Sequence, residues 1–451
     1  MKDLLLILTI LINCSVYSQG KSSYDSLLIN KYEDQLLPGY SILVGNFDSI
    51  IYETQYGFAD IENKKPITKN TQFRIGSITK QFTAISILML VEEGKIKLTS
   101  SAREYVPFLP KKVTIEHLLW HTSGLVSYFD DLDIPDSSFV LNYSPKDLVW
   151  LIEDEKLMSK PNIEYHYNNS GYHLLGYIIE QVSGKSYSEY LKDNFFSPLN
   201  MNDTECEYAQ SNIENLAYGY ENIDSNLTIP DYYTMDWPYS AGNIVSTPSD
   251  LLKWNKALFQ GEIIGDSLLS YAHTAHTLNN GESTHYGFGW EIRKIQDETS
   301  LRHSGFLEGY LSTLIFIPEH NISVAVLTNC SNYSTELFST KLAALAIGKP
   351  ILSPKKIEVE QTELEQFENR YGFEEDVIVF EIIEGELCFS FEYDPTSHHF
   401  LYPIAKNVFY SNEFGCTLTF DNENNCMTLK IGERETIGKK LNTTKVADAQ
   451  P

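Results

Sequence analysis

The segment FRIGSITKQFTAISILMLVEEG, residues 73–94, is the most informative part of this 451-residue chain. Its apolar side chains would cover nearly every face of a helix, which is typical of a helix buried inside a domain. Gly94 is suited to end that helix, because glycine readily adopts the left-handed conformation of a helix C-terminus. The segment therefore predicts a central helix that other elements must enclose.

A hydroxyl and an amine lie close together at the start of this helix. Ser77 opens it and Lys80 follows three residues later, so both side chains share one face. The positive helix end and the loss of water both lower the pKa of a lysine here, which frees its lone pair to act as a base. The N–H of Ser77 is free to bind an oxyanion. The same spacing also arises from a helix-capping serine followed by a surface lysine.

Two later motifs carry groups that suit the same chemistry. Tyr167 and Asn169 lie in a polar loop before a predicted helix. A phenol near an ammonium ionises more easily and acts as general base or acid, while an amide orients the lysine or binds a substrate carbonyl. The motif RHSG, residues 302–305, stands just before a strand-like segment, where glycine lets a substrate backbone approach. Taken singly, the first motif is equally typical of an aromatic loop residue with a turn asparagine, and the second of an ordinary hairpin turn.

Strand-like segments at both ends of the first 350 residues enclose a helical middle. A hairpin is expected over 38–60, and further strands over 285–294, 311–319 and 322–330. Helices are expected over 114–124, 170–195 and 247–261, the last with Ser249 as its N-cap. This order predicts an α+β domain in which one sheet packs against helices.

The residue pattern of the sequence changes near residue 350, from mixed helix and strand segments to strand-like alternation. We expect the helix-and-sheet domain to cover 19–350, a linker 351–363, a small all-β domain 364–440 and an unstructured tail 441–451.

The first 18 residues have the pattern of a signal peptide. Lys2 precedes the apolar run 4–12, and Val16 and Ser18 fit a cleavage site. The run is too short to span a bilayer, and no other window is long and apolar enough. We therefore expect an exported protein, periplasmic or secreted. The alternatives are an N-terminal core strand and a lipid anchor on Cys14, which the bulky Asn13 disfavours.

Charge and cysteine content exclude several classes of partner. The chain has 34 Lys and Arg against 61 Asp and Glu, a net charge of −27, which disfavours nucleic acid as a partner. Five of its six cysteines lie beyond the signal, at positions 206, 330, 388, 416 and 426, with no CxxC pair that would indicate zinc. Whether Cys416 and Cys426 pair across a hairpin stays open. His117 and His121, four residues apart, lack the glutamate of a metalloprotease motif and are assigned a structural role.

In order and combination, the chain resembles the class C-like branch of the serine β-lactamase and penicillin-binding-protein superfamily. The segments that carry the resemblance are FRIGSITKQFTA, EEGKIKL, VTIEHLLWHTSGL, YNNSGYHLLGYIIEQVSGKSYSEYL, SPLNMNDT, SAGNIVSTPSDLLKW, YGFGW and RHSGFLEGY, and they extend over about residues 30–345. The resemblance implies an antiparallel sheet flanked by helices. It also implies a small appended barrel-like β domain, and neither a metal nor an organic cofactor.

The resemblance also implies roles for the site residues. Ser77 would attack a carbonyl and become acylated, with Lys80 helping to remove its proton. Tyr167 would pass that proton to the leaving group and later activate water. Asn169 would hold Lys80 and the substrate amide.

The third motif would bind the substrate. His303, Ser304 and Gly305 would lie along it, and the N–H groups of Ser77 and Phe306 would form the oxyanion hole.

One departure from the family pattern bears on substrate choice. The third motif often begins with lysine, whereas here it begins with His303, which is mostly neutral at pH 7. Strand alternation turns Arg302 away from the site, so recognition of a substrate carboxylate should be weak. Asn168, in place of a smaller residue, is expected to alter the cleft.

We therefore expect a secreted serine hydrolase acting on esters, D-amino-acid peptides or amides, or peptidoglycan-type peptides, with modest β-lactamase activity. A D-Ala-D-Ala carboxypeptidase is one of the serine hydrolases that would meet this expectation. The alternative is a catalytically silent penicillin-binding sensor or scaffold of the cell wall.

Overall fold

The computed structural model describes residues 23–27, 37–223, 226–331, 334–373, 376–412, 414–431 and 434–441. The proposed signal segment, with Cys14, and the tail from residue 442 onward lie outside these residues. The chain divides into two compact units at Pro350 and Ile351, apart from residues 224–226, which group with the second unit. Each unit has its own hydrophobic core.

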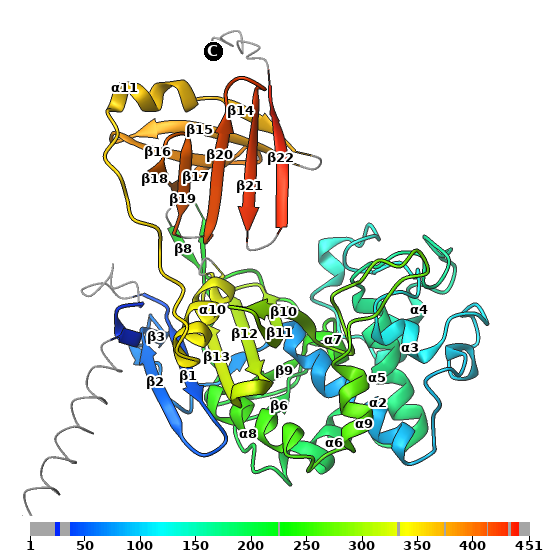
Figure 1. Ribbon diagram of the computed structural model, residues 1–451. Coiled ribbons are helices and arrows are strands. Elements are labelled where there is room, and N and C mark those ends of the chain that lie inside the picture. The colour runs from blue at the N-terminus through cyan, green and yellow to red at the C-terminus, as the bar shows by residue number, and fades with distance from the viewer. Residues whose placement is uncertain are drawn as a thin grey trace, which may run out of the picture. The chain divides into compact units, whose positions relative to one another are not determined.

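A six-stranded antiparallel sheet with the order β10-β11-β12-β13-β1-β2 organises the first unit (Figure 1). Its strands are β1 Tyr40–Gly45, β2 Ile50–Tyr56, β10 Glu291–Ile295, β11 Glu298–Leu307, β12 Tyr310–Ile317 and β13 Ile322–Thr328. The N-terminal hairpin thus joins strands that lie nearly 300 residues later. Every residue of β13 is buried, because helices pack against the sheet.

Helices and short strands fill the rest of the first unit. The helices are α2 Thr79–Glu92, α3 Ile115–Leu119, α4 Pro145–Trp150, α5 Asn169–Ser183, α6 Tyr187–Leu191, α7 Tyr239–Gly242, α8 Pro248–Phe259, α9 Asp266–Ala272 and α10 Thr335–Ala346. The short strands are β3 Phe58–Asp60, β4 Lys65–Pro66, β5 Phe73–Arg74, β6 Glu205–Cys206, β7 Glu221–Ile223, β8 Asn226–Thr228 and β9 Ile244–Ser246.

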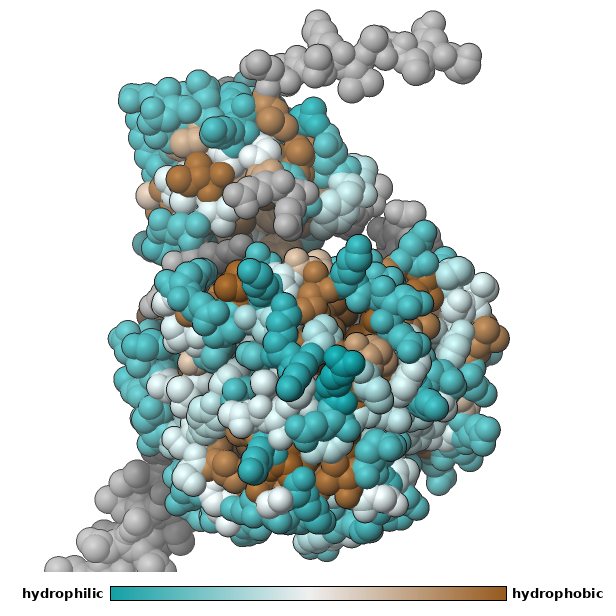
Figure 2. Space-filling model, turned by 90° about the vertical axis from the view of Figure 1, so that its right-hand side faces the viewer, coloured by the Kyte–Doolittle hydropathy of each residue, from teal (hydrophilic) through white to brown (hydrophobic). Residues whose placement is uncertain are grey.

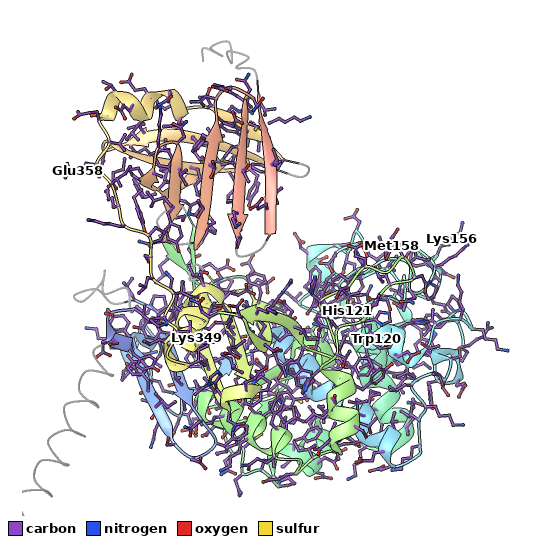
Figure 3. All side chains as sticks on the ribbon, in the orientation of Figure 1. Trp120, His121, Lys156, Met158, Lys349 and Glu358 are labelled. Carbon is purple, nitrogen blue, oxygen red and sulfur yellow. The ribbon has the colours of Figure 1, made fainter. Side chains whose placement is uncertain are left out.

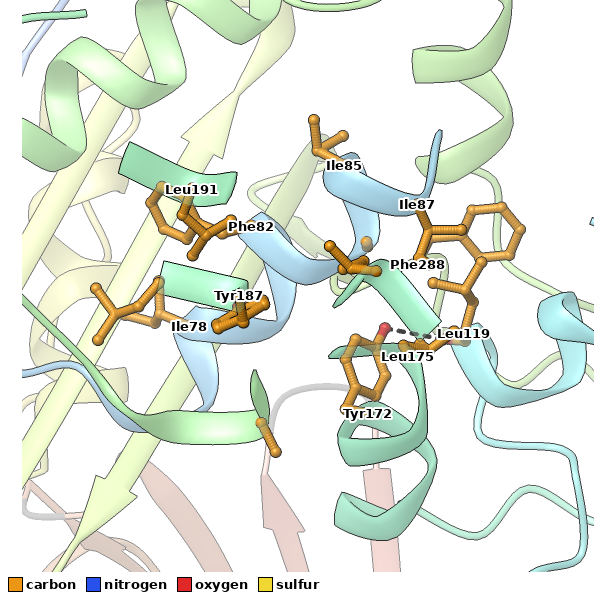
Figure 4. Close-up of a cluster of buried hydrophobic side chains, with 14 of the residues drawn as sticks. Ile78, Phe82, Ile85, Ile87, Leu119, Tyr172, Leu175, Tyr187, Leu191 and Phe288 are labelled. Carbon is orange, nitrogen blue, oxygen red and sulfur yellow. Dashed lines mark hydrogen bonds between the residues drawn. The ribbon is translucent and has the colours of Figure 1, made fainter. Parts of the chain in front are cut away.

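Helix α2 is the buried central helix that its composition predicts. Phe82 stacks on Trp254 of α8, with ring centroids 4.1 Å apart. Figure 4 shows its side chains among those of α5 and α6, where apolar residues from distant parts of the chain meet. The helix ends at Glu92, and Gly94 has the left-handed φ of +72° expected of it. Ser77, however, lies in a 3₁₀ turn, Gly76–Ile78, that precedes α2.

One further local prediction is wrong. The N-cap of α8 is Thr247 rather than Ser249, because Pro248 takes the first helical position and the Thr247 hydroxyl accepts the N–H of Asp250. The RHSG motif stands before β12, as expected, and itself lies inside strand β11.

The second unit is a nearly closed, barrel-like antiparallel sheet with the order β17-β16-β15-β14-β22-β21-β20-β19-β18. Its strands are β14 Arg370–Gly372, β15 Val377–Ile383, β16 Glu386–Phe391, β17 Asp394–Phe400, β18 Tyr402–Ala405, β19 Val408–Ser411, β20 Cys416–Asp421, β21 Cys426–Ile431 and β22 Arg434–Lys440. The expected linker is partly structured, because helix α11, Gln361–Leu364, begins inside it and the N–H of Ile357 donates to Pro403.

The hairpin of β20 and β21 settles the question about Cys416 and Cys426. Cys416 is opposite Ile431, and Cys426 is opposite Asp421, so the two thiols lie at opposite ends of the hairpin. None of the five described cysteines forms a disulfide.

None of the helices among the described residues is long and apolar enough to cross a membrane. No group of three or more His, Cys, Asp or Glu in the described ranges is arranged to hold a metal ion. Figure 2 shows a mostly hydrophilic face with separate hydrophobic patches.

Candidate active site

Lys80 lies at the centre of the predicted site. Its side chain is fully buried, and its Nζ lies 2.9 Å from Ser77 Oγ, 2.8 Å from Asn169 Oδ1 and 3.0 Å from the carbonyl oxygen of Ala241. The structure therefore brings together Ser77 before α2, Lys80 in α2 and Asn169 at the start of α5. Ser77 itself is only partly buried and remains accessible.

Burial favours the neutral form of the amine, and the hydrogen bonds show how that form would be oriented. Burial lowers the pKa of Lys80 well below its ordinary value, and the negative charge of Asp130 only partly opposes this. A neutral amine has two N–H bonds and one lone pair. The oxygens of Asn169 and Ala241 can only accept, so they take the two N–H bonds. The lone pair then faces the Ser77 hydroxyl, which is the arrangement a general base requires.

Tyr167 lies beside this pair. Its hydroxyl oxygen is buried and has no hydrogen-bond partner among the described residues, while Lys80 Nζ lies 4.8 Å from the centroid of its ring. Burial raises the pKa of the Tyr167 phenol strongly, and the nearby Ser77 hydroxyl lowers it only in part. The expectation that an adjacent ammonium eases its ionisation is therefore wrong, because burial is the largest influence on the phenol and raises its pKa. Tyr167 holds its proton in the free protein.

The Asn168 side chain caps helix α5 rather than shaping the cleft. Its side chain is buried, accepts the N–H of Gly171 at 2.7 Å and donates to the carbonyl of Leu125 at 2.7 Å. It is the N-cap of α5 and holds Asn169 in the first turn. The expectation that Asn168 alters the cleft is therefore wrong.

His303 faces the site from β11 and is neutral. Its Nδ1 lies 2.6 Å from the carbonyl oxygen of Ser304, which can only accept, so the proton is on Nδ1. Its Nε2 must then accept from the Tyr286 hydroxyl at 2.9 Å. Burial and the nearby Lys80 lower the pKa of His303 to about 3. The imidazole therefore offers no positive charge to a substrate carboxylate.

The neighbours of His303 on the strand point to the other face. Arg302 pairs with Glu336 of α10 at 2.9 Å, as strand alternation predicts. The Ser304 hydroxyl donates to the same carboxylate at 2.6 Å. The Ser304 side chain is therefore not part of the site, and only its backbone remains a candidate for substrate contact.

Two glycines hold the predicted oxyanion donors together. A β-carbon on Gly305 would lie 2.0 Å from the carbonyl oxygen of Ile75, so only glycine allows β11 to pack against the turn before Ser77. A β-carbon on Gly76, whose φ is +49°, would lie 2.9 Å from the backbone nitrogen of Phe306. The backbones of Gly76 and Phe306 are thus in close contact, next to Ser77.

A buried ion pair anchors the segment that leads to Ser77. Arg74 of β5 donates through Nε and Nη2 to the two carboxylate oxygens of Glu207, both at 2.8 Å. Strands β5 and β6 both pair with β9. The two-point contact ties the chain before Ser77 to this small sheet.

The sequence analysis missed two residues that adjoin the site. His117 has the structural role assigned to it, since its Nδ1 contacts Thr114 at the start of α3. His121 instead packs against Tyr167, with ring centroids 4.4 Å apart (Figure 3 marks its position). Tyr286, the partner of His303, was also missed. The only indication in the sequence that these residues adjoin the site was that they lie in WHTSGL and YGFGW, two segments that carry the family resemblance.

Comparisons with known proteins identify the family of the chain. A family model described as Beta-lactamase matches residues 25–348. Penicillin-binding protein 4* of Bacillus subtilis is 31% identical over 335 residues, which cover 70% of this chain and 74% of that protein. Several further curated relatives are matched over 64% of their own length, which is less than two thirds.

Solved structures also resemble the chain. The octameric penicillin-binding protein homologue from Pyrococcus abyssi has a TM-score of 0.65 and 26% identity, and the match covers 93% of this chain and 99% of that one. The D-amino acid amidase from Ochrobactrum anthropi SV3, complexed with D-phenylalanine, has a TM-score of 0.61 and 25% identity, covering 73% and 96%.

Proposed function

The chain belongs to the Beta-lactamase family, and on that premise we propose that it is a serine hydrolase that forms an acyl-enzyme on Ser77. The observation that carries the proposal is the 2.9 Å contact between Lys80 Nζ and Ser77 Oγ, in a site where burial lowers the pKa of the lysine. Asn169 and Ala241 hold the amine in this orientation.

Acylation follows from these contacts. Lys80 Nζ takes the proton of Ser77 as Oγ bonds to the substrate carbonyl carbon. The carbonyl π electrons move to its oxygen, which the N–H groups of Ser77 and Phe306 stabilise. Tyr167 then gives its proton to the leaving nitrogen or oxygen and regains one from protonated Lys80. The bond to the leaving group breaks as the carbonyl re-forms.

Deacylation reverses the roles. Water enters where the leaving group was, and gives a proton to the Tyr167–Lys80 pair as it attacks the acyl carbon. The bond to Ser77 Oγ then breaks, and Lys80 returns a proton to that oxygen.

The charges around the site favour substrates without a carboxylate beside the scissile bond. His303 is neutral, and Arg302 is engaged by Glu336. The carboxylates of Asp130 and Glu291 are close enough to raise the pKa of Tyr167. Esters and D-amino-acid amides, including those with a free ammonium, fit this environment better than carboxylate-terminated peptides or β-lactams. The D-amino acid amidase among the structural neighbours supports this choice.

A substrate panel tests the proposal. Purified protein is assayed with a p-nitrophenyl ester, a D-amino-acid p-nitroanilide, a D-Ala-D-Ala peptide and a chromogenic cephalosporin, with Ser77→Ala as control. We expect hydrolysis of the first two to exceed that of the others and to vanish in Ser77→Ala. Binding of penicillin with no turnover of any substrate would instead favour a silent penicillin-binding protein.

We place this activity outside the cytoplasm, as residues 1–18 suggest. Fractionation of cells that express the full chain tests that placement.

A further inference from the structure

His121 contacts the chain on both sides of Tyr167. Its carbonyl oxygen accepts the N–H of His166 at 3.0 Å, and its Nδ1 accepts the N–H of Asn168 at 3.0 Å. Its ring lies against that of Tyr167, with centroids 4.4 Å apart and an interplanar angle of 40°. One residue therefore holds the residue before the phenol, the residue after it and the phenol ring itself.

The backbone of His121 is in an uncommon conformation. Its φ is +59°, in the left-handed region that non-glycine residues seldom occupy. Residues persist in this region only where their surroundings hold them, and they cluster at functional sites. Backbone hydrogen bonds in the same loop stabilise this conformation. The N–H of Thr122 donates to the carbonyl oxygen of His117 at 2.9 Å, and the carbonyl oxygen of Thr122 accepts the N–H of Asn162 at 2.8 Å.

The hydrogen bonds also determine which tautomer of His121 is present. Because Nδ1 accepts a backbone N–H, the single proton of the neutral ring is on Nε2. Nε2 is buried and has no partner among the described residues. Burial and the neighbouring Lys80 lower the pKa of His121 well below its ordinary value, so the ring stays neutral. His121 therefore contributes to the site through the packing of its ring and the acceptor Nδ1, and not through a charge.

We propose that His121 is a positioning residue that fixes the Tyr167 hydroxyl beside Ser77, through the paired contacts of its carbonyl oxygen and Nδ1 with His166 and Asn168. The inference rests on the proposed acylation of Ser77 and extends it to a residue outside the three motifs. His121 itself does not touch the reacting atoms. Its effect should therefore appear in the rate of the chemical step more than in substrate binding.

Three substitutions separate the contributions of His121. His121→Phe keeps a ring against Tyr167 and removes the acceptor, which leaves the Asn168 N–H buried and unpaired. His121→Gly suits the positive φ and removes the side chain altogether. His121→Asn keeps an acceptor at the δ position and tolerates the left-handed conformation. His117→Phe and His117→Asn are matched controls, because the His117 side chain contacts Thr114 at the start of its own helix, and the backbone carbonyl that accepts the N–H of Thr122 is kept in both variants.

The acylation rate and the KM for a p-nitrophenyl ester are measured on folded protein. His121→Phe and His121→Gly should lower the acylation rate by about 10- to 100-fold with little change in KM. His121→Asn should recover most of the loss, and the His117 variants should resemble the wild type. Equal losses at His117, or no recovery in His121→Asn, would overturn the proposal. If His121→Phe fails to fold, the comparison of His121→Gly with His121→Asn still tests the effect of removing the acceptor.

A second readout does not depend on activity. Amide hydrogen exchange is measured for peptides spanning residues 163–170 in the wild type and each variant. Faster exchange there in His121→Gly, but not in His121→Asn, supports the positioning role even if the wild type is never acylated. Unchanged exchange would overturn it. Failure of the proposed function and failure of this inference are thus distinguishable.

Discussion

Lys80 Nζ lies 2.9 Å from Ser77 Oγ, and its own two N–H bonds are taken by other oxygens. In its neutral form the amine is arranged to receive the serine proton, and burial lowers its pKa, which favours that form. The predicted chemistry depends on this single contact, because every later step returns the proton to one of these two side chains or to Tyr167.

Replacing Lys80 with a permanently charged residue should abolish the base. In Lys80→Arg the guanidinium stays protonated and cannot accept the proton of Ser77. We expect the acylation rate to fall by about 10²- to 10⁴-fold, the usual contribution of a general base. Stopped-flow measurement of the p-nitrophenol burst checks this, with Lys95→Arg on the exposed surface as the control. A Lys80→Arg burst rate within threefold of wild type would show that another group is the base.

The pH dependence of acylation should follow Lys80. Burial holds its pKa well below 10.5, so the amine is neutral above the lowered value and protonated below it. The rate should be level at alkaline pH and fall as the pH falls through that lowered value. His303, whose pKa is lowered to about 3, should add no step in the neutral range, so His303→Gln should keep the same midpoint. A midpoint near 10.5 would mean that Lys80 is not the titrating base.

Substrate charge preference should depend on His303. His303→Lys places an ammonium where the native imidazole is neutral, and a charge-assisted hydrogen bond to a substrate carboxylate becomes available. We expect kcat/KM for a chromogenic cephalosporin, relative to a D-amino-acid p-nitroanilide, to rise by about tenfold. His303→Gln, which stays neutral, should leave this ratio near its native value. An equal ratio in the two variants would show that charge at this position does not select the substrate.

The packing of β11 against the Ser77 turn should tolerate no added methyl group. In Gly305→Ala the new β-carbon would lie 2.0 Å from the Ile75 carbonyl oxygen, so the strand or the turn must move. We expect a loss of about 1–3 kcal/mol in the free energy of unfolding and a larger loss in acylation rate. Gly281→Ala is the control for lost stability alone, because its φ of +89° strains an alanine while nothing lies within 4 Å of the added carbon, so it should keep the native acylation rate. Denaturant titration and burst kinetics on both variants separate the two effects.

Local spacing was enough to predict the central site. Ser77 and Lys80 lie three residues apart and meet across the start of α2, and strand alternation correctly turned Arg302 away from the cleft. These predictions depend on contacts within a few residues, or on a period that a single element imposes. The buried α2 was predictable for the same reason, since its apolar residues surround the helix.

Features set by long-range packing were not predictable. The state of Tyr167 depends on how completely the surrounding chain excludes water, and the sequence does not report this. The separation of Cys416 and Cys426 depends on the register of one hairpin. His121 meets Tyr167 only because its backbone adopts a left-handed conformation that its sequence pattern does not signal. Choosing Thr247 over Ser249 as a helix cap required knowing where Pro248 sits.

Intact-protein mass measurement after reaction with a phosphonate ester tests the central claim most directly. The wild type should gain the mass of one phosphonyl group, and peptide mapping should locate it on Ser77. Ser77→Ala should gain no mass under the same conditions. Equal modification of Ser77→Ala, or a label on any other residue of the wild type, would contradict the account.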